Sequence, residues 1–271
     1  MTESGSSPLY YRVTGAPGKP LVVFLHGFLG SADDWNEILP AFETSFRCVA
    51  VDLPGHGRSY RASGGVPCTF LDAATALIEV VDAIDAPSFS LVGYSMGGRL
   101  ALYAASIYAM RVDRLVLESA SPGLRTGHER EERKARDEQL ARQLESQPLE
   151  AFVREWYEQP LFATLARNPE RREALIARRL HNAPQGLAAS LRGMGTGVQA
   201  PLWNELAANT IPALLVAGAD DSKFVALGQE MERTCAAASL NVMPGAGHCV
   251  HYEIPSAYTK VVKAFLEGSE E

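Results

Sequence analysis

Ser95 stands between two glycines in the stretch Gly93-Tyr94-Ser95-Met96-Gly97, where the apolar run FSLVGY meets a helix that begins near Met96. A serine hydroxyl is a poor base and a poor nucleophile unless a histidine accepts its proton and a carboxylate orients that histidine. The pattern G-x-S-x-G between a strand and a helix is typical of a nucleophile elbow, a cramped turn that projects the serine above a sheet. The stretch therefore indicates chemistry that depends on an activated serine.

Two later loops supply the partners that such a serine needs. Asp221 lies just beyond the buried run that ends at Gly218, and His248 lies in the Gly-rich stretch MPGAGHCVH after the next strand. Open parallel sheets build their sites from loops at the carboxyl ends of the strands. We therefore expect a triad of Ser95, His248 and Asp221, with Asp220 and, more distantly, Glu118 as alternative acids.

Backbone groups are expected to complete the site. In FLHGFLGS the strand ends at His26-Gly27, and the turn that follows directs the N–H of Phe28 toward the elbow. The N–H of Met96 opens the helix after the serine. Two such donors form an oxyanion hole, in which each stabilises a developing negative charge by roughly 3 kcal/mol.

The elements that must position these residues alternate between strand and helix, which is typical of a parallel sheet with crossover helices. The central strands are apolar nearly throughout, as expected of strands covered on both faces. Strands are expected at 9–13, 20–26, 46–53, 89–94, 113–119, 211–219 and 239–245, and helices within 31–43, at 70–86, from about 96 and at 257–268.

The alternation stops at about residue 119. Residues 119–200 contain twelve Arg and one Lys against eleven Asp and Glu, a net charge of +2, whereas the rest of the chain carries -9. Most of these arginines are expected on a solvated helix face with i,i+4 ion pairs. A few are available to bind planar carboxylates. We expect an α/β core, residues 1–118 and 201–271, with a helical cap, residues 119–200, inserted after about the sixth strand.

The overall composition excludes several classes of function. A net charge of -7 disfavours a broad surface for nucleic acid or for an anionic membrane. No apolar stretch approaches the ~18 residues that span a bilayer, and the first residues do not resemble a secretory signal. Four scattered cysteines fit reduced thiols and a cytoplasmic location. Neither a metal nor an organic cofactor is implied, and the oligomeric state is not predicted.

Several motifs together resemble the α/β-hydrolase superfamily along essentially the whole chain, namely HGFLGS, DLPGHGRS, GYSMGG, the G-x-x-D before SKF, and GAGH. A narrower resemblance, to the 2-succinyl-6-hydroxy-2,4-cyclohexadiene-1-carboxylate synthases, is carried by GYSMGGR, ESASPGL, REWYEQPLF, RRLHN and AGADDSKF. These lyases of menaquinone and phylloquinone biosynthesis eliminate pyruvate from 2-succinyl-5-enolpyruvyl-6-hydroxy-3-cyclohexene-1-carboxylate.

The narrower resemblance implies roles for five further residues. By position, Arg99, Arg133 and Arg179 match a carboxylate-binding patch, and Tyr94 and Trp156 match aromatic residues of the substrate site. The implied substrate is a small tricarboxylate, and removing its carboxylates from water without compensation is costly. The implied chemistry is proton abstraction next to the succinyl ketone, by Ser95 or directly by His248.

Two other functions stay open. A serine carboxylesterase or carbon–carbon bond hydrolase would use Ser95 as a true nucleophile and form an acyl-enzyme. A small-molecule receptor would keep the pocket without useful turnover.

Overall fold

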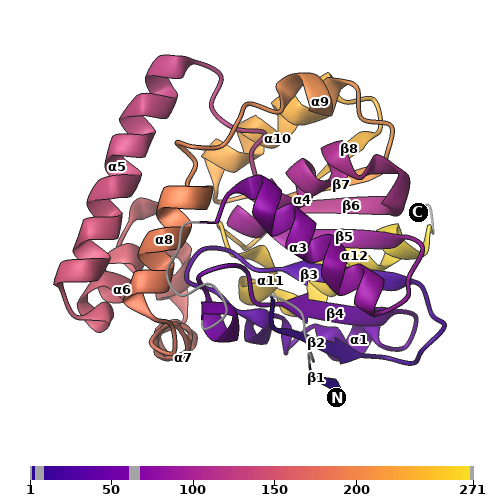
Figure 1. The fold of residues 1–271 in the computed structure, drawn as a ribbon, viewed down its shortest axis with the longest axis horizontal. Coiled ribbons are helices and arrows are strands. Elements are labelled where there is room, and N and C mark those ends of the chain that lie inside the picture. The colour runs from indigo at the N-terminus through magenta and orange to yellow at the C-terminus, as the bar shows by residue number, and fades with distance from the viewer. Residues whose placement is uncertain (1, 4–8, 61–67, 269–271) are drawn as a thin grey trace.

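The computed structural model of the chain describes residues 2–3, 9–60 and 68–268, which form one sheet flanked by helices (Figure 1). The strand order is β1-β2-β4-β3-β5-β6-β7-β8. The strands are β1 (Thr2–Glu3), β2 (Tyr11–Thr14), β3 (Leu21–Leu25), β4 (Arg47–Val51), β5 (Phe89–Tyr94), β6 (Val112–Glu118), β7 (Ala213–Gly218) and β8 (Ala238–Met243). The β1–β2 and β2–β4 pairs are antiparallel, and the five other strand pairs of the described chain are parallel. The expected α/β fold with a mostly parallel sheet is confirmed.

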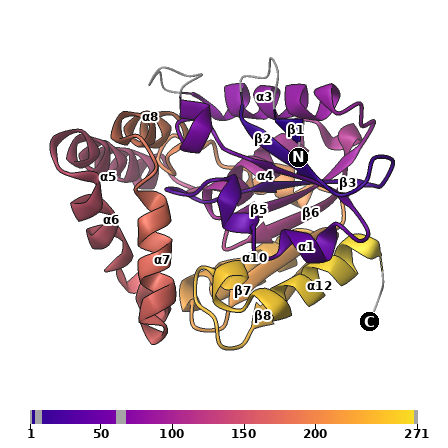
Figure 2. The ribbon, with the colours of Figure 1, turned by 90° about the horizontal axis from the view of Figure 1, so that it is seen from below.

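The sheet is covered on both faces, as Figure 2 shows. Side chains alternate along β3: Val23 and Leu25 face one apolar cluster, whereas Val22 and Phe24 face the other, and all four are fully buried. Helices α3 (Phe70–Ala83) and α4 (Met96–Ile107) cover the first face, and α1 (Leu39–Phe42) and α12 (Pro255–Glu267) cover the second. Burial of both faces explains why the central strands are apolar at nearly every position.

The helix expected within residues 31–43 is broken into two short pieces. Ser31 caps the first, η1 (Ala32–Trp35), by accepting a hydrogen bond from the N–H of Asp33. Pro40 stands at the start of α1, where its missing N–H costs nothing, because the first turn of a helix has no internal acceptor. The remaining helices of the core are η2 (Gly57–Ser59), η3 (Ala109–Arg111), α9 (Trp203–Ala207), α10 (Ser222–Thr234) and α11 (Val250–Glu253).

A block of helices without strands separates β6 from β7 in the described chain and lies at one end of the sheet (Figure 1). It consists of α5 (Gly127–Ser146), α6 (Leu149–Tyr157), η4 (Pro160–Arg167), α7 (Pro169–Arg179) and α8 (Pro184–Met194). A capping box between Thr126 and Glu129 starts α5, which packs against α8. Only Asp137, Ala141 and Leu144 of α5 are buried, so most of its charges are solvated.

No helix of the described chain has both the length and the apolar character that crossing a bilayer would require. Within the same residues, no group of three or more His, Cys, Asp or Glu side chains is arranged to hold a metal ion.

Candidate active site

The turn between β5 and α4 holds Ser95 in a left-handed conformation, with φ 49° and ψ -107°. This turn is possible only because Gly97 has no side chain: a Cβ there would lie 2.2 Å from the carbonyl oxygen of Leu25. The N–H of Ser95 donates to the carbonyl oxygen of Glu118 on the neighbouring strand, at 2.8 Å. The geometry is that of a nucleophile elbow, in which backbone strain presents the hydroxyl above the sheet.

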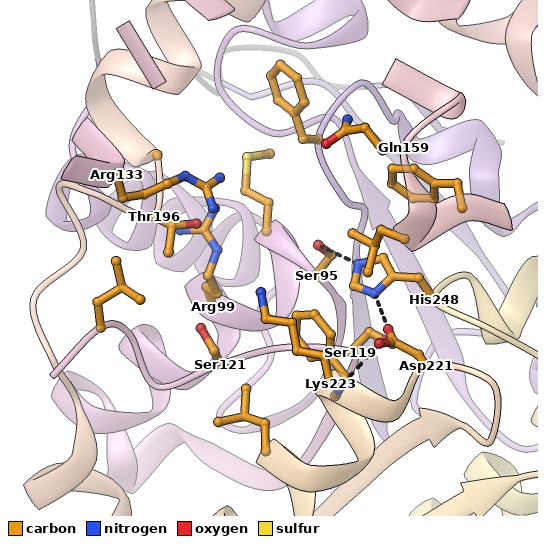
Figure 3. Close-up of a pocket in the computed structure, with 18 of the residues that line it drawn as sticks. Ser95, Arg99, Ser119, Ser121, Arg133, Gln159, Thr196, Asp221, Lys223 and His248 are labelled. Carbon is orange, nitrogen blue, oxygen red and sulfur yellow. Dashed lines mark hydrogen bonds and ion pairs between the residues drawn. The ribbon is translucent and has the colours of Figure 1, made fainter. Parts of the chain in front are cut away.

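The structure brings Ser95, His248 and Asp221 together, as Figure 3 shows. His248 Nδ1 donates to Asp221 Oδ2 at 2.7 Å, which leaves Nε2 free to accept from the Ser95 hydroxyl at 3.3 Å. The second oxygen of Asp221 accepts from the N–H of Phe224, at 3.2 Å. The carboxylate therefore fixes both the tautomer and the direction of the imidazole ring.

The two alternative acids have other partners. Asp220 forms an ion pair with Arg167 at 2.7 Å, on the surface. Glu118 is fully buried and accepts from His251 Nδ1 at 2.8 Å. Neither carboxylate is placed to orient His248.

Two residues beside Ser95 have backbone N–H groups without a partner in the described chain. They are Phe28 and Met96, which both line the cavity at Ser95. Both groups are therefore available to an oxygen atom of a bound substrate, as an oxyanion hole requires.

Two buried histidines support the loop that carries Phe28. His56 Nε2 accepts from the N–H of Leu29 at 3.2 Å, and His26 Nε2 accepts from the N–H of Leu53 at 2.9 Å. In each ring Nδ1 then carries the proton, which it donates to a backbone carbonyl. Burial, reinforced by the nearby His26, lowers the pKa of His56 to about 3. The hydrogen bond to Leu29 therefore depends on a neutral ring.

The site opens into a cavity of about 780 Å³ between the core and the helical block. Its lining combines cations, hydroxyl and amide groups, and apolar side chains. The polar residues of the lining, apart from the triad, are Arg99, Ser119, Ser121, Arg133, Arg136, Gln159, Ser190, Thr196, Asp220, Ser222, Lys223 and Glu230.

Arg99 and Arg133 meet at this cavity from α4 and α5 (Figure 3). Arg99 is buried and donates to the carbonyl oxygen of Met194 at 2.9 Å and to Gln199 Oε1 at 3.2 Å. Burial, with Arg133 nearby, lowers the pKa of Arg99 to about 9, so the guanidinium stays charged at neutral pH at a cost. Arg133 is fixed through Nε by Asp137 at 2.7 Å. A carboxylate bound between the two would relieve the mutual repulsion.

The two aromatic residues implied by the resemblance occupy different places. Trp156 lines the cavity and contacts the Phe28 ring edge-on, with centroids 5.0 Å apart. Tyr94 is buried and does not line the cavity: its hydroxyl lies 2.8 Å from Cys249 Sγ, and its ring packs beside His248. In this structure Tyr94 supports the catalytic histidine.

Arg179 does not reach the cavity, which departs from the sequence-based expectation. Its guanidinium pairs with Asp34, and the two side chains are only 6% and 3% exposed. Arg179 Nε also donates to the Tyr157 hydroxyl at 2.9 Å. Burial alone would raise the pKa of Asp34, but the guanidinium outweighs it and the pKa is lowered. The physical reason for the departure is that a buried aspartate needs this cation as its partner.

The end of α7 also reaches the loops near Phe28. Asn182 donates to the carbonyl oxygen of Leu29 at 2.8 Å and accepts from the N–H of Gly57 at 2.8 Å. Together with the ion pair between Arg179 and Asp34, these bonds connect α7 and the turn after it to the loop that carries Phe28 and to its neighbours.

Sequence reasoning missed several polar residues of the cavity, among them Lys223, Gln159 and Thr196. Lys223 and Gln159 stand within AGADDSKF and REWYEQPLF, so their neighbourhoods were singled out but their side chains were not. Thr196 lies in a turn after α8 and has no comparable signal in the sequence.

The neutral state of His56 predicts a specific loss of stability in acid. In the unfolded chain His56 titrates near pH 6.5, but in the folded chain its pKa is about 3. As the pH falls below 6.5, the unfolded state therefore binds the proton first. Between pH 7.5 and 4.5 this group alone lowers the free energy of unfolding by about 2–3 kcal/mol. His56→Gln should lose less stability over this range, measured by urea unfolding at each pH.

The exposed His128 provides the matched control, because His128→Gln should leave the pH dependence of the unfolding free energy as it is in the parent chain. Equal pH dependence in His56→Gln and the parent chain would contradict a neutral His56 in the folded state.

The buried ion pair predicts a large effect of Arg179→Met on folding. Removing the cation leaves Asp34 buried and charged without its partner, which costs about 3–5 kcal/mol. Adding Asp34→Asn in the same chain should recover part of this loss. The measurement is the free energy of unfolding in urea at pH 7.5.

Arg167→Met is the control for Arg179→Met, because its pair with Asp220 is exposed and contributes about 1 kcal/mol or less. If the two single variants lost similar amounts of stability, the assignment of Arg179 as the partner that neutralises Asp34 would be wrong.

Comparison with known proteins agrees with this geometry. The profile of the alpha/beta hydrolase fold matches residues 20–255. The 2-succinyl-6-hydroxy-2,4-cyclohexadiene-1-carboxylate synthase of Escherichia coli O7:K1 is 40% identical over 242 residues, which are 89% of this chain and 92% of that protein. Among solved structures, MenH from S. aureus has a TM-score of 0.91 and 31% identity, covering 96% of this chain and 99% of that one.

A hydrolase from Pseudomonas aeruginosa PA01 also has the fold, with a TM-score of 0.81 and 26% identity, covering 98% of this chain and 97% of that one. The fold alone therefore does not separate synthases from hydrolases. The extent and identity of the matches show that the chain belongs to the α/β-hydrolase family, in the group that includes the 2-succinyl-6-hydroxy-2,4-cyclohexadiene-1-carboxylate synthases.

Proposed function

We propose that this protein is an enzyme that forms 2-succinyl-6-hydroxy-2,4-cyclohexadiene-1-carboxylate by eliminating pyruvate from 2-succinyl-5-enolpyruvyl-6-hydroxy-3-cyclohexene-1-carboxylate, a step of menaquinone or phylloquinone biosynthesis. The name of the E. coli relative, 40% identical over most of both chains, supports this reaction. The observation that carries the proposal here is the presence of two arginines, Arg99 and Arg133, at the cavity above the triad.

The reaction begins with removal of a proton from the ring carbon that bears the succinyl ketone. The Ser95 hydroxyl and His248 are within hydrogen-bonding distance of each other, at 3.3 Å, so the proton ends on His248 Nε2 whichever of the two takes it first. Asp221 stabilises the resulting imidazolium through the bond at 2.7 Å. Negative charge then develops on the ketone oxygen, which the N–H groups of Phe28 and Met96 stabilise.

Elimination follows from the positions of the double bonds. The electron pair released at carbon 2 forms a double bond between carbons 2 and 3, the double bond between carbons 3 and 4 moves to carbons 4 and 5, and the carbon–oxygen bond at carbon 5 breaks. The leaving enolpyruvate takes the proton held by His248 and becomes pyruvate by tautomerisation. The ring keeps two conjugated double bonds, and no acyl-enzyme forms.

The arginines account for the binding of this substrate. It carries three carboxylates, on the succinyl arm, the ring and the enolpyruvyl arm, and each loses hydration on entering the cavity. Arg99 is held by Met194 and Gln199, and Arg133 is held by Asp137, so both guanidinium groups are oriented before the substrate arrives. Preorganised cations of this kind both offset desolvation and fix the orientation of the ring.

We further propose that residues 119–200 act as a cap over a core formed by 1–118 and 201–271, and that the enzyme works in the cytoplasm. The cap supplies Arg133 and Trp156 to the cavity, whereas the triad comes from the core. The four free cysteines support a reducing compartment.

The test of the function is turnover of the enolpyruvyl cyclohexene carboxylate. We expect pyruvate to be released together with the absorbance of the conjugated diene. Arg99→Met should lower kcat/KM for this tricarboxylate, because a charge-assisted hydrogen bond is lost. The loss of transition-state stabilisation should be roughly 2 kcal/mol or more.

Hydrolysis of a neutral ester serves as the control, since Arg99→Met should barely change it. Absence of pyruvate release by the parent chain, combined with burst kinetics on activated esters, would reject the lyase in favour of a serine hydrolase.

A further inference from the structure

The charges that line the cavity are not balanced. Its acids are all engaged: Asp220 pairs with Arg167 at 2.7 Å, Glu230 pairs with Arg125, and Asp221 holds His248. The two oxygens of Asp221 accept from His248 at 2.7 Å and from the N–H of Phe224 at 3.2 Å, so each already has a partner within the protein. No negative charge of the described lining is therefore left to neutralise a further cation.

Two cations of the lining, Lys223 and Arg136, have no ion pair or hydrogen bond within the described chain. Arg136 stands one turn from Arg133 on α5 and extends the positive charge of that helix. Lys223 comes from a different element, the first turn of α10, two residues after Asp221. Positive charge thus reaches the cavity from α4, α5 and α10.

The Lys223 side chain reaches into the cavity on the side of Ser95 and Arg99 (Figure 3). Its Nζ lies 5.5 Å from the centroid of the neighbouring Phe224 ring. An ammonium on a flexible stem binds a carboxylate as a point charge with three donors, without the fixed geometry that a guanidinium demands. Lys223 is therefore suited to an anion that the arginines do not hold.

We propose that Lys223 binds one carboxylate of the substrate and is the third cation of the site, with Arg99 and Arg133. This inference rests on the proposed function, because it takes a tricarboxylate as the ligand.

Two observations favour Lys223 as this third cation. Arg179, the third arginine expected from the sequence, is paired with Asp34 and does not line the cavity. Arg136 stands on the same helix as Arg133, so of the two cations unpaired within the described chain only Lys223 brings charge from an element other than α4 and α5. Lys223 comes from the core, next to the triad.

The first experiment measures binding without turnover, with tricarballylate as the probe. Isothermal titration at low salt should show that Lys223→Met weakens binding about 10-fold, the effect of losing one charge-assisted hydrogen bond in a partly solvated site. Lys223→Arg, which keeps the charge, should stay within about 3-fold of the parent chain. Unchanged binding by Lys223→Met, or no binding of tricarballylate by the parent chain, overturns the proposal.

Lys134→Met is the matched control, because Lys134 is an exposed lysine of α5 that does not line the cavity. Its removal changes the net charge by the same amount and should alter binding by less than about 2-fold. A loss equal to that of Lys223→Met would mean that long-range charge alone attracts the probe, which contradicts a subsite at Lys223.

The second experiment separates this inference from the function itself. With the enolpyruvyl cyclohexene carboxylate, Lys223→Met should raise KM about 10-fold with a smaller change in kcat, because the contact exists before and during the reaction. Pyruvate release with an unchanged KM would refute the subsite and leave the lyase in place. Tricarballylate binding that depends on Lys223, without any pyruvate release, would refute the lyase and keep the subsite.

Discussion

The strained turn at Ser95 is the constraint on which the rest of the site depends. A non-glycine residue at φ 49° and ψ -107° costs about 1–3 kcal/mol, and the surrounding structure must hold it there. Glu118 contributes twice: its carbonyl oxygen accepts from the N–H of Ser95, and its buried carboxylate accepts from His251, three residues after the catalytic histidine. One residue of β6 therefore links the elbow to the loop that carries His248.

The second constraint is electrostatic. A cavity that accepts several carboxylates must hold cations in a partly dehydrated place before the anion arrives, and those cations must keep donor atoms that are not paired with acids of the protein. The structure meets both demands by separate means. Arg99 is held by neutral acceptors, Met194 and Gln199, while Asp137 fixes Arg133 through Nε alone. The acids of the lining are occupied elsewhere, so the cavity keeps an excess of positive charge although the chain carries -7.

Buried polar contacts join the helical block to the core, in addition to exposed ion pairs such as Arg167–Asp220. Arg179 neutralises Asp34, and Asn182 holds the carbonyl oxygen of Leu29, on the loop that also carries Phe28. On the other side of that loop, neutral His56 accepts from the N–H of Leu29. The loop that carries Phe28, one donor of the proposed oxyanion hole, is thus held by residues from both parts of the chain. The proposed oxyanion hole is therefore coupled to the position of the helices above it.

The sequence by itself determined the parallel sheet, the helical insertion and the order of Ser95, Asp221 and His248, because these follow from local signals: apolar runs, glycine turns and loops at strand ends. Only the tertiary structure decided which cations line the cavity. Neighbouring positions on a helix point about 100° apart, so RR at 178–179 does not reveal which guanidinium faces inward, nor that its partner Asp34 lies 145 residues away. The sequence does not single out Lys223 either, because a lysine in the first turn of a helix becomes a candidate ligand only when the fold places it beside a cavity without a free acid.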